Sequence, residues 1–160
     1  MTAITFATTT RTRRTWQAWA LAVVELFVAY QAVSGGVGLM TNSWQLPTEW
    51  LVRTPFQTWE GPGWVLICLV GVPHVLAAIP PVLMPGRPRL GILAGYLAGG
   101  SLLVWIAVQV ALLQQYYFLQ PVVAVIGLIE AGLAFWWQRR TSAGPVAALK
   151  RPDHIGAEGR

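Results

Sequence analysis

The sequence predicts an all-α protein built as a bundle of four transmembrane helices. Apolar residues make up 55% of the 160 residues and charged residues only 11%, whereas a soluble domain carries about 25% charge. The apolar residues fall into four long runs, and each run has roughly the 20 residues that a helix needs to cross the hydrocarbon core. The nine tryptophans fit this prediction, because tryptophan concentrates at membrane–water interfaces.

The chain is predicted to alternate between apolar spans and polar connections. We expect four spans, at about 16–40, 63–84, 90–113 and 119–137, with an outer loop at 41–62 between the first two. A disordered basic tail at 1–15 precedes them, and a polar tail at 138–160 follows them. Outer loop 41–62 is too polar to cross the bilayer, and we expect it to lie on the membrane surface, with a short helix within 48–53. The loop either covers the bundle as a lid or gates a ligand site. The connections at 85–89 and 114–118 are short, which favours an up-down-up-down bundle.

The basic residues predict the orientation. The two tails and the connection at 85–89 hold ten of the eleven Lys and Arg residues, and such clusters mark the cytoplasmic side. Both termini are therefore expected in the cytoplasm. The preference for Arg over Lys is typical of a GC-rich bacterial genome, so the expected location is the bacterial inner membrane. Arg13 and Arg14 also resemble a twin-arginine signal, but the following run is long for a signal and no A-x-A cleavage motif follows it.

The net charge of +5 does not predict nucleic-acid binding, because the charges lie in short clusters between apolar runs. Small residues predict where the helices touch, since transmembrane helices associate through close backbone approach. In the third span, Gly91, Gly95 and Gly99 form a GxxxGxxxG stripe. We therefore expect this stripe to face another helix.

Three ionisable residues lie inside the predicted spans, where each costs several kcal/mol unless it is paired or neutralised. At about 1.5 Å per residue, Glu25 lies about 13 Å, His74 about 15 Å and Glu130 about 10 Å from the cytoplasmic ends of their helices. These residues are therefore predicted to meet in one layer. Pro73 precedes His74 and should kink the second span.

The polar layer has two interpretations. It is either structural, joining helices through hydrogen bonds, or it is a functional site. For a functional site, the candidates for catalysis are Glu25, His74 and Glu130, although no catalytic role is assigned. The predicted ligand-binding residues are Glu25, Gln31, His74, Trp105, Gln109 and Glu130.

Familiar chemical motifs do not appear in the sequence. It contains no HExxH, Walker loop, Gly-x-Ser-x-Gly or cysteine pair, and Cys68 is the single cysteine. The three ionisable residues have no metal-ligand spacing, so neither a metal nor a cofactor is predicted. Whether the protein is an enzyme stays open.

The runs TPFQTWEGPGWVLICLVGVPHVLAA and FLQPVVAVIGLIEAGLAF resemble the second and last spans of small four-helix bacterial membrane proteins, loosely similar to DoxX-like proteins. This resemblance implies a fold and no activity. Small multidrug-resistance transporters share four spans and a Glu in the first span, but they lack a long outer loop. Sterol isomerases of the emopamil-binding type use intramembrane Glu, His and Trp in a helical pocket. Glu25, His74, Glu130 and Trp105 resemble that set of residues by analogy alone.

The function predicted first is a binding or accessory membrane protein whose bundle encloses a pocket for a small apolar ligand. The alternatives are an intramembrane enzyme that acts on a lipid or isoprenoid by proton transfer, and a proton-coupled transporter. The expected partners are membrane lipids, and either a second copy of the chain or another membrane protein.

Overall fold

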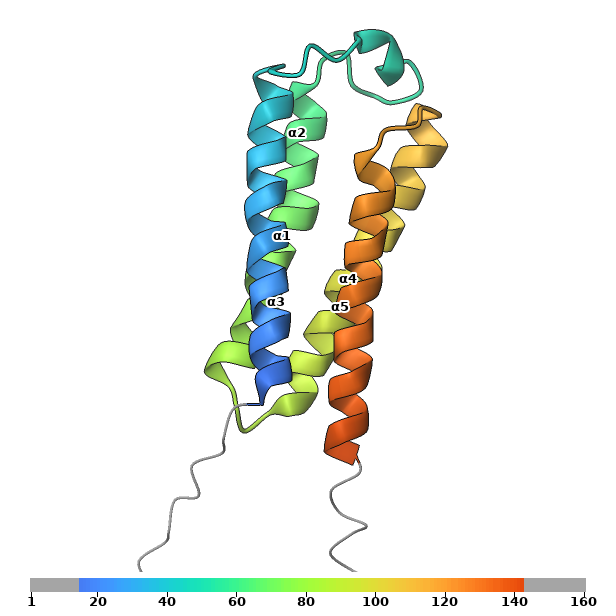
Figure 1. The fold of residues 1–160 in the computed structure, drawn as a ribbon. Coiled ribbons are helices and arrows are strands. Elements are labelled where there is room, and N and C mark those ends of the chain that lie inside the picture. The colour runs from blue at the N-terminus through green and yellow to red at the C-terminus, as the bar shows by residue number, and fades with distance from the viewer. Residues whose placement is uncertain (1–14, 143–160) are drawn as a thin grey trace, which may run out of the picture.

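The computed structural model describes residues 15–142, and within that range the chain is made of helices and loops (Figure 1). The elements are α1 (Trp16–Met40), the short 3-10 helix η1 (Thr48–Leu51), α2 (Glu60–Leu66), the π-helix η2 (Ile67–Gly71), α3 (Val72–Leu83), α4 (Pro88–Leu113) and α5 (Leu119–Ser142). Four helical segments are long and apolar enough to cross a membrane, since α2, η2 and α3 together form the second. The predicted fold class is confirmed.

The bundle consists of two antiparallel hairpins (Figure 1). In one hairpin α1 packs on the second span, and in the other α4 packs on α5. The hairpins contact each other through α3 with α4 and through α1 with α5. We call the end where α1 begins and α5 ends the termini end, and the opposite end the loop end (Figure 1). The predicted cytoplasmic placement of the termini end stays a prediction.

The helix bounds agree with the predicted spans to within one residue except at three ends. The second helical segment begins at Glu60 rather than at Gly63. Helix α4 begins at Pro88, because proline is well suited to the first turn, where its missing N–H has no helical partner. Helix α5 continues past Trp137 to Ser142 with Arg139 and Arg140 in its last turn, where positive charge interacts favourably with the helix dipole. The tails predicted at 1–15 and 138–160 lie almost wholly outside the described residues.

The connection between α1 and α2 folds on itself at the loop end. The indole Nε1 of Trp59 donates a hydrogen bond to the carbonyl oxygen of Leu46 at 3.0 Å, and Leu51 is buried. Helix η1 lies inside the predicted stretch 48–53. Whether this loop acts as a lid or as a gate stays open.

The second span changes its hydrogen-bond pattern midway. Pro73 has no backbone N–H and cannot continue an α-helical pattern. The chain forms a π-helical turn there, in which the N–H of Val72 bonds to the carbonyl of Ile67, five residues earlier. Such turns insert one extra residue into a helix and occur often at functional sites. The predicted disturbance at Pro73 therefore takes the form of a π-helical turn that ends at Gly71, three residues before His74.

The glycine stripe of α4 faces other helices, as predicted. A Cβ atom at Gly91 would lie 2.6 Å from the Trp137 ring, and one at Gly95 would lie 2.8 Å from a Leu21 methyl group. A Cβ atom at Gly99 would lie 2.5 Å from the carbonyl oxygen of Gly127. All three contacts are closer than real side chains make, so the stripe sets the distance between α4 and its neighbours.

Candidate functional site

The three ionisable residues of the spans converge inside the bundle. Glu25 on α1, His74 on α3 and Glu130 on α5 each have 0% exposed surface. One ligand atom from each side chain lies within 4.8 Å of the others. The predicted polar layer is therefore confirmed, and we call these three residues the polar cluster.

Helix packing explains how the two glutamates reach the centre. Glu25 belongs to a stripe of α1 in which the residues one turn away are buried as well, namely Leu21, Ala22, Val28 and Ala29. Glu130 lies on the face of α5 that touches α4, where a Cβ atom at Gly99 would lie 3.2 Å from the Glu130 Cβ. Small residues at this contact bring α5 close enough to direct Glu130 inward.

The imidazole of His74 is oriented by its own helix. Its Nδ1 lies 2.7 Å from the carbonyl oxygen of Val70. A carbonyl can only accept a hydrogen bond, so Nδ1 carries a proton and donates it. The other ring nitrogen, Nε2, lies 3.5 Å from Oε2 of Glu130. This distance is longer than the roughly 2.7–3.2 Å of a protein hydrogen bond.

Five polar atoms of the cluster make no hydrogen bond to any described residue. They are both carboxylate oxygens of Glu25, both of Glu130, and Nε2 of His74. Native proteins contain only a few unsatisfied buried polar groups per 100 residues, and each one calls for an explanation. Five of the six unsatisfied buried side-chain atoms among the described residues belong to this one small cluster, and the sixth is the indole Nε1 of Trp137. This concentration of unsatisfied atoms makes the polar cluster the candidate site.

Apolar layers enclose the polar cluster on both sides. Toward the termini end lie Ala18, Leu21, Ile92 and Trp137. Toward the loop end lie Val28, Ala32, Val70 and Leu102. These layers keep water away and lower the local dielectric constant, which strengthens every electrostatic interaction in the cluster. The cost of an uncompensated charge rises for the same reason.

The other predicted ligand-binding residues lie outside the polar cluster. Trp105 is half-buried and packs against the apolar layer at the loop end. Gln109, one turn further along α4, is also half-buried, whereas Gln31 is exposed on α1. A role in ligand binding stays a prediction for these three residues.

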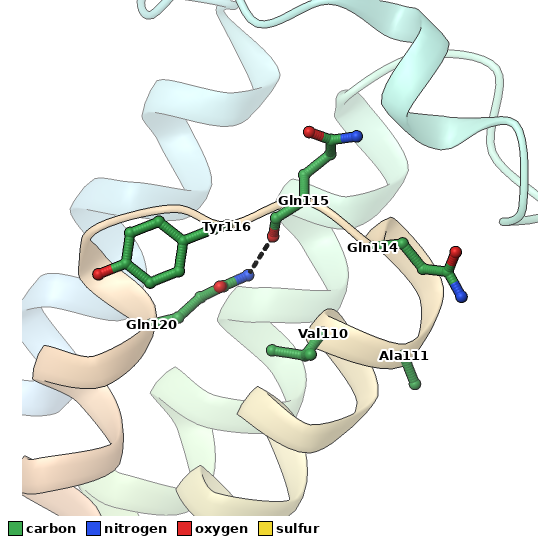
Figure 2. Close-up of a pocket in the computed structure, with 6 residues that line it drawn as sticks. All are labelled: Val110, Ala111, Gln114, Gln115, Tyr116 and Gln120. Atoms are coloured by element: carbon green, nitrogen blue, oxygen red, sulfur yellow. Dashed lines mark hydrogen bonds between the residues drawn. The ribbon is translucent and has the colours of Figure 1, made fainter.

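A shallow hollow lies at the loop end, between the end of α4 and the start of α5 (Figure 2). Gln120 is buried there, and its amide both donates and accepts a hydrogen bond. Its Nε2 donates to the Gln115 carbonyl at 3.1 Å, and its Oε1 accepts from the Tyr117 N–H at 3.2 Å. Sequence reasoning missed Gln120, because a single polar residue at a helix start carries no spacing signal. Both polar atoms of its amide therefore help to hold the α4–α5 turn.

Comparison of the chain with protein-family models, with curated proteins and with solved structures gives no match. The similarity to DoxX-like proteins stays a prediction. Function must therefore be argued from the polar cluster itself.

Proposed function

We propose that the protein is a binding or accessory protein of the bacterial inner membrane, which holds a small lipophilic ligand inside its helix bundle. The ligand's polar group binds to the polar cluster, and both termini lie in the cytoplasm. The observation that supports binding is the set of five unsatisfied polar atoms in the cluster. The charge distribution, with ten of eleven basic residues in the tails and the 85–89 connection, supports the orientation.

The chemistry of the cluster narrows the class of ligand. Four of the five unsatisfied atoms are carboxylate oxygens, which accept hydrogen bonds or bind positive charge. A ligand with an apolar body and a hydroxyl or amine at one end would donate hydrogen bonds to these atoms. Its apolar end would contact side chains such as Val28 and Leu102, which form the adjacent layer.

The apolar layer at the loop end lies between the polar cluster and that end of the bundle. Val28 and Val70 of one hairpin pack there in one cluster with Leu102 of the other. Half-buried Trp105 packs beside the apolar layer on that side. A lipophilic molecule would pass between the hairpins from the membrane and reach the cluster through this layer.

Proton-transfer catalysis on a lipid or isoprenoid is the second candidate function. The observation that favours it is the pairing of a base with an acid, since His74 Nε2 and Glu130 Oε2 lie 3.5 Å apart. Such a pair could remove a proton at one carbon and return it at another. Proton-coupled transport has less support, because the two apolar layers would both have to open.

The proposed function is tested by identifying the small molecules that copurify with the protein. We expect a lipophilic compound on the wild-type chain purified from membranes in detergent, measured by mass spectrometry of its organic extract. Glu25→Gln should reduce the bound amount at subsaturating ligand by roughly twofold to tenfold, since a hydrogen bond contributes about 0.5–1.5 kcal/mol.

The matched control is Glu49→Gln, the same chemical change at an exposed residue of η1. This variant should carry as much compound as the wild type. Recovery of only the bulk membrane lipids from wild-type protein would contradict the proposal. Equal amounts of compound on wild type and Glu25→Gln would contradict it as well.

A further inference from the structure

The polar cluster offers the donor atoms of a transition-metal site. It contains one imidazole nitrogen and two carboxylates, from α1, α3 and α5. Zinc and its first-row neighbours accept this mixture of nitrogen and oxygen donors, whereas Ca²⁺ and Mg²⁺ prefer oxygen alone. Local spacing could not reveal the set in the sequence, because each donor comes from a different helix.

The distances in the cluster are close to those that coordination requires. Bonds of about 2.0–2.1 Å in a tetrahedral site place the donor atoms roughly 3.4 Å apart. Nε2 of His74 and Oε2 of Glu130 are 3.5 Å apart, and the whole set lies within 4.8 Å. Rotation of the Glu25 side chain, whose oxygens have no hydrogen-bond partner among the described residues, would close the remaining gap.

The imidazole of His74 is held by a hydrogen bond of the kind that usually orients a metal-binding histidine. A metal-binding histidine usually donates its second N–H to a carboxylate or a backbone carbonyl, which fixes the ring and its tautomer. His74 donates from Nδ1 to the carbonyl of Val70 at 2.7 Å. In the neutral ring, the lone pair of Nε2 then faces the carboxylate of Glu130. Two acceptors oppose each other in this arrangement, and a cation between them turns the repulsion into attraction.

Charge balance selects a divalent ion over a monovalent one. When a metal displaces the carboxyl protons, the two ionised carboxylates and a neutral imidazole carry a charge of −2, so a divalent cation makes the loaded cluster neutral. Neutrality matters because apolar layers lie on both sides of the cluster and a net charge is costly in such surroundings. A monovalent cation would leave one negative charge uncompensated. Protons alone could also neutralise the cluster, and the experiment below separates the two cases.

We infer that Glu25, His74 and Glu130 together bind one divalent transition-metal ion of the zinc type. Three protein ligands leave a fourth coordination position open, as in catalytic zinc sites and unlike closed structural ones. The inference rests on the proposed function, because the open position is where the polar group of the lipophilic ligand would bind. The metal would bind the oxygen of the ligand, which two ionised carboxylates could not bind by themselves because they only accept hydrogen bonds.

The test measures zinc binding by the full chain in detergent. Wild-type protein, stripped with a chelator and titrated with Zn²⁺, should bind one ion per chain and melt at a higher temperature when zinc is present. Glu25→Gln and His74→Gln should each weaken zinc affinity by more than tenfold, since even indirect supporting residues contribute about 10–100-fold. X-ray absorption of the zinc-loaded protein should show nitrogen and oxygen donors, including imidazole.

Each variant has a matched control elsewhere in the chain. Glu49→Gln changes an exposed glutamate, and His154→Gln changes the other of the two histidines. Both controls should keep wild-type affinity. The inference is overturned if zinc leaves the melting temperature of wild-type protein unchanged, or if the cluster variants bind zinc as tightly as the controls. The wild-type melting experiment decides the question even if a cluster variant fails to fold.

The metal and the proposed function fail in distinguishable ways. Wild-type protein that carries a lipophilic compound and does not bind zinc would overturn the metal inference and leave the proposed function in place. Protein that binds zinc at the cluster and carries no such compound would support the metal site and contradict the proposed binding of a lipophilic ligand.

Discussion

Gly99→Leu is expected to prevent stable folding of the bundle. A Cβ atom at this position would lie 2.5 Å from the Gly127 carbonyl oxygen and 2.9 Å from the Ala131 nitrogen. Both are backbone atoms, so no side chain can move aside and the helices α4 and α5 must separate. Overpacking a core costs about 1–3 kcal/mol and occasionally more, and here a whole helix contact would be lost. The measurement is the yield and melting temperature of the purified protein.

Gly100→Leu is the matched control, one residue further along the same helix. A Cβ atom at Gly100 meets nothing within 4 Å, so this variant should fold and melt close to the wild type. The comparison removes any general effect of adding a leucine or of losing helical glycine. Equal melting temperatures for the two variants would show that α4 and α5 do not pack through Gly99.

Simultaneous replacement of the polar cluster by apolar residues is expected to separate stability from function. The variant Glu25→Met, His74→Leu, Glu130→Met removes the unsatisfied atoms while keeping much of the side-chain volume. Replacing buried ionic groups with packed apolar residues is often neutral or stabilising by about 1–4 kcal/mol. We therefore expect a melting temperature equal to or above that of the wild type, measured without zinc, together with loss of the copurifying compound.

The contrary result would identify the cluster as structural, which is the second interpretation of the polar layer. In that case the apolar variant would express poorly or melt well below the wild type. Ser34→Leu is a useful comparison, since it removes an exposed polar residue from α1 and should change neither stability nor the bound compound. A stable apolar variant that still carries the compound would contradict the proposed site.

The sequence predicted the helical architecture and the depth of the polar layer well. The long apolar runs reveal the spans because a helix must cross a hydrocarbon layer of nearly constant thickness. The rise per residue converts positions in each span into depths, which brought Glu25, His74 and Glu130 to one level. Their mutual distances could not be predicted, because they depend on how each helix is rotated about its axis.

Helix rotation also explains why Gln31 does not join the polar cluster. Gln31 follows Glu25 by six positions, which turns it about 120° away around α1, and its side chain is exposed. The π-helical turn before His74 was not predicted, since Pro73 predicts a kink without specifying the pattern that replaces the α-helix. The orientation of the imidazole depends on that turn, because its acceptor is the carbonyl of Val70.

An experimental density map of the wild-type protein, purified from membranes without added ligand or metal, tests the central claim most directly. It should show Glu25, His74 and Glu130 directed into the bundle, with density between them that belongs to a metal ion or to the polar end of a ligand. A map in which Glu25 points to lipid, or in which the three groups lie more than about 10 Å apart, roughly a helix diameter, would contradict the claim.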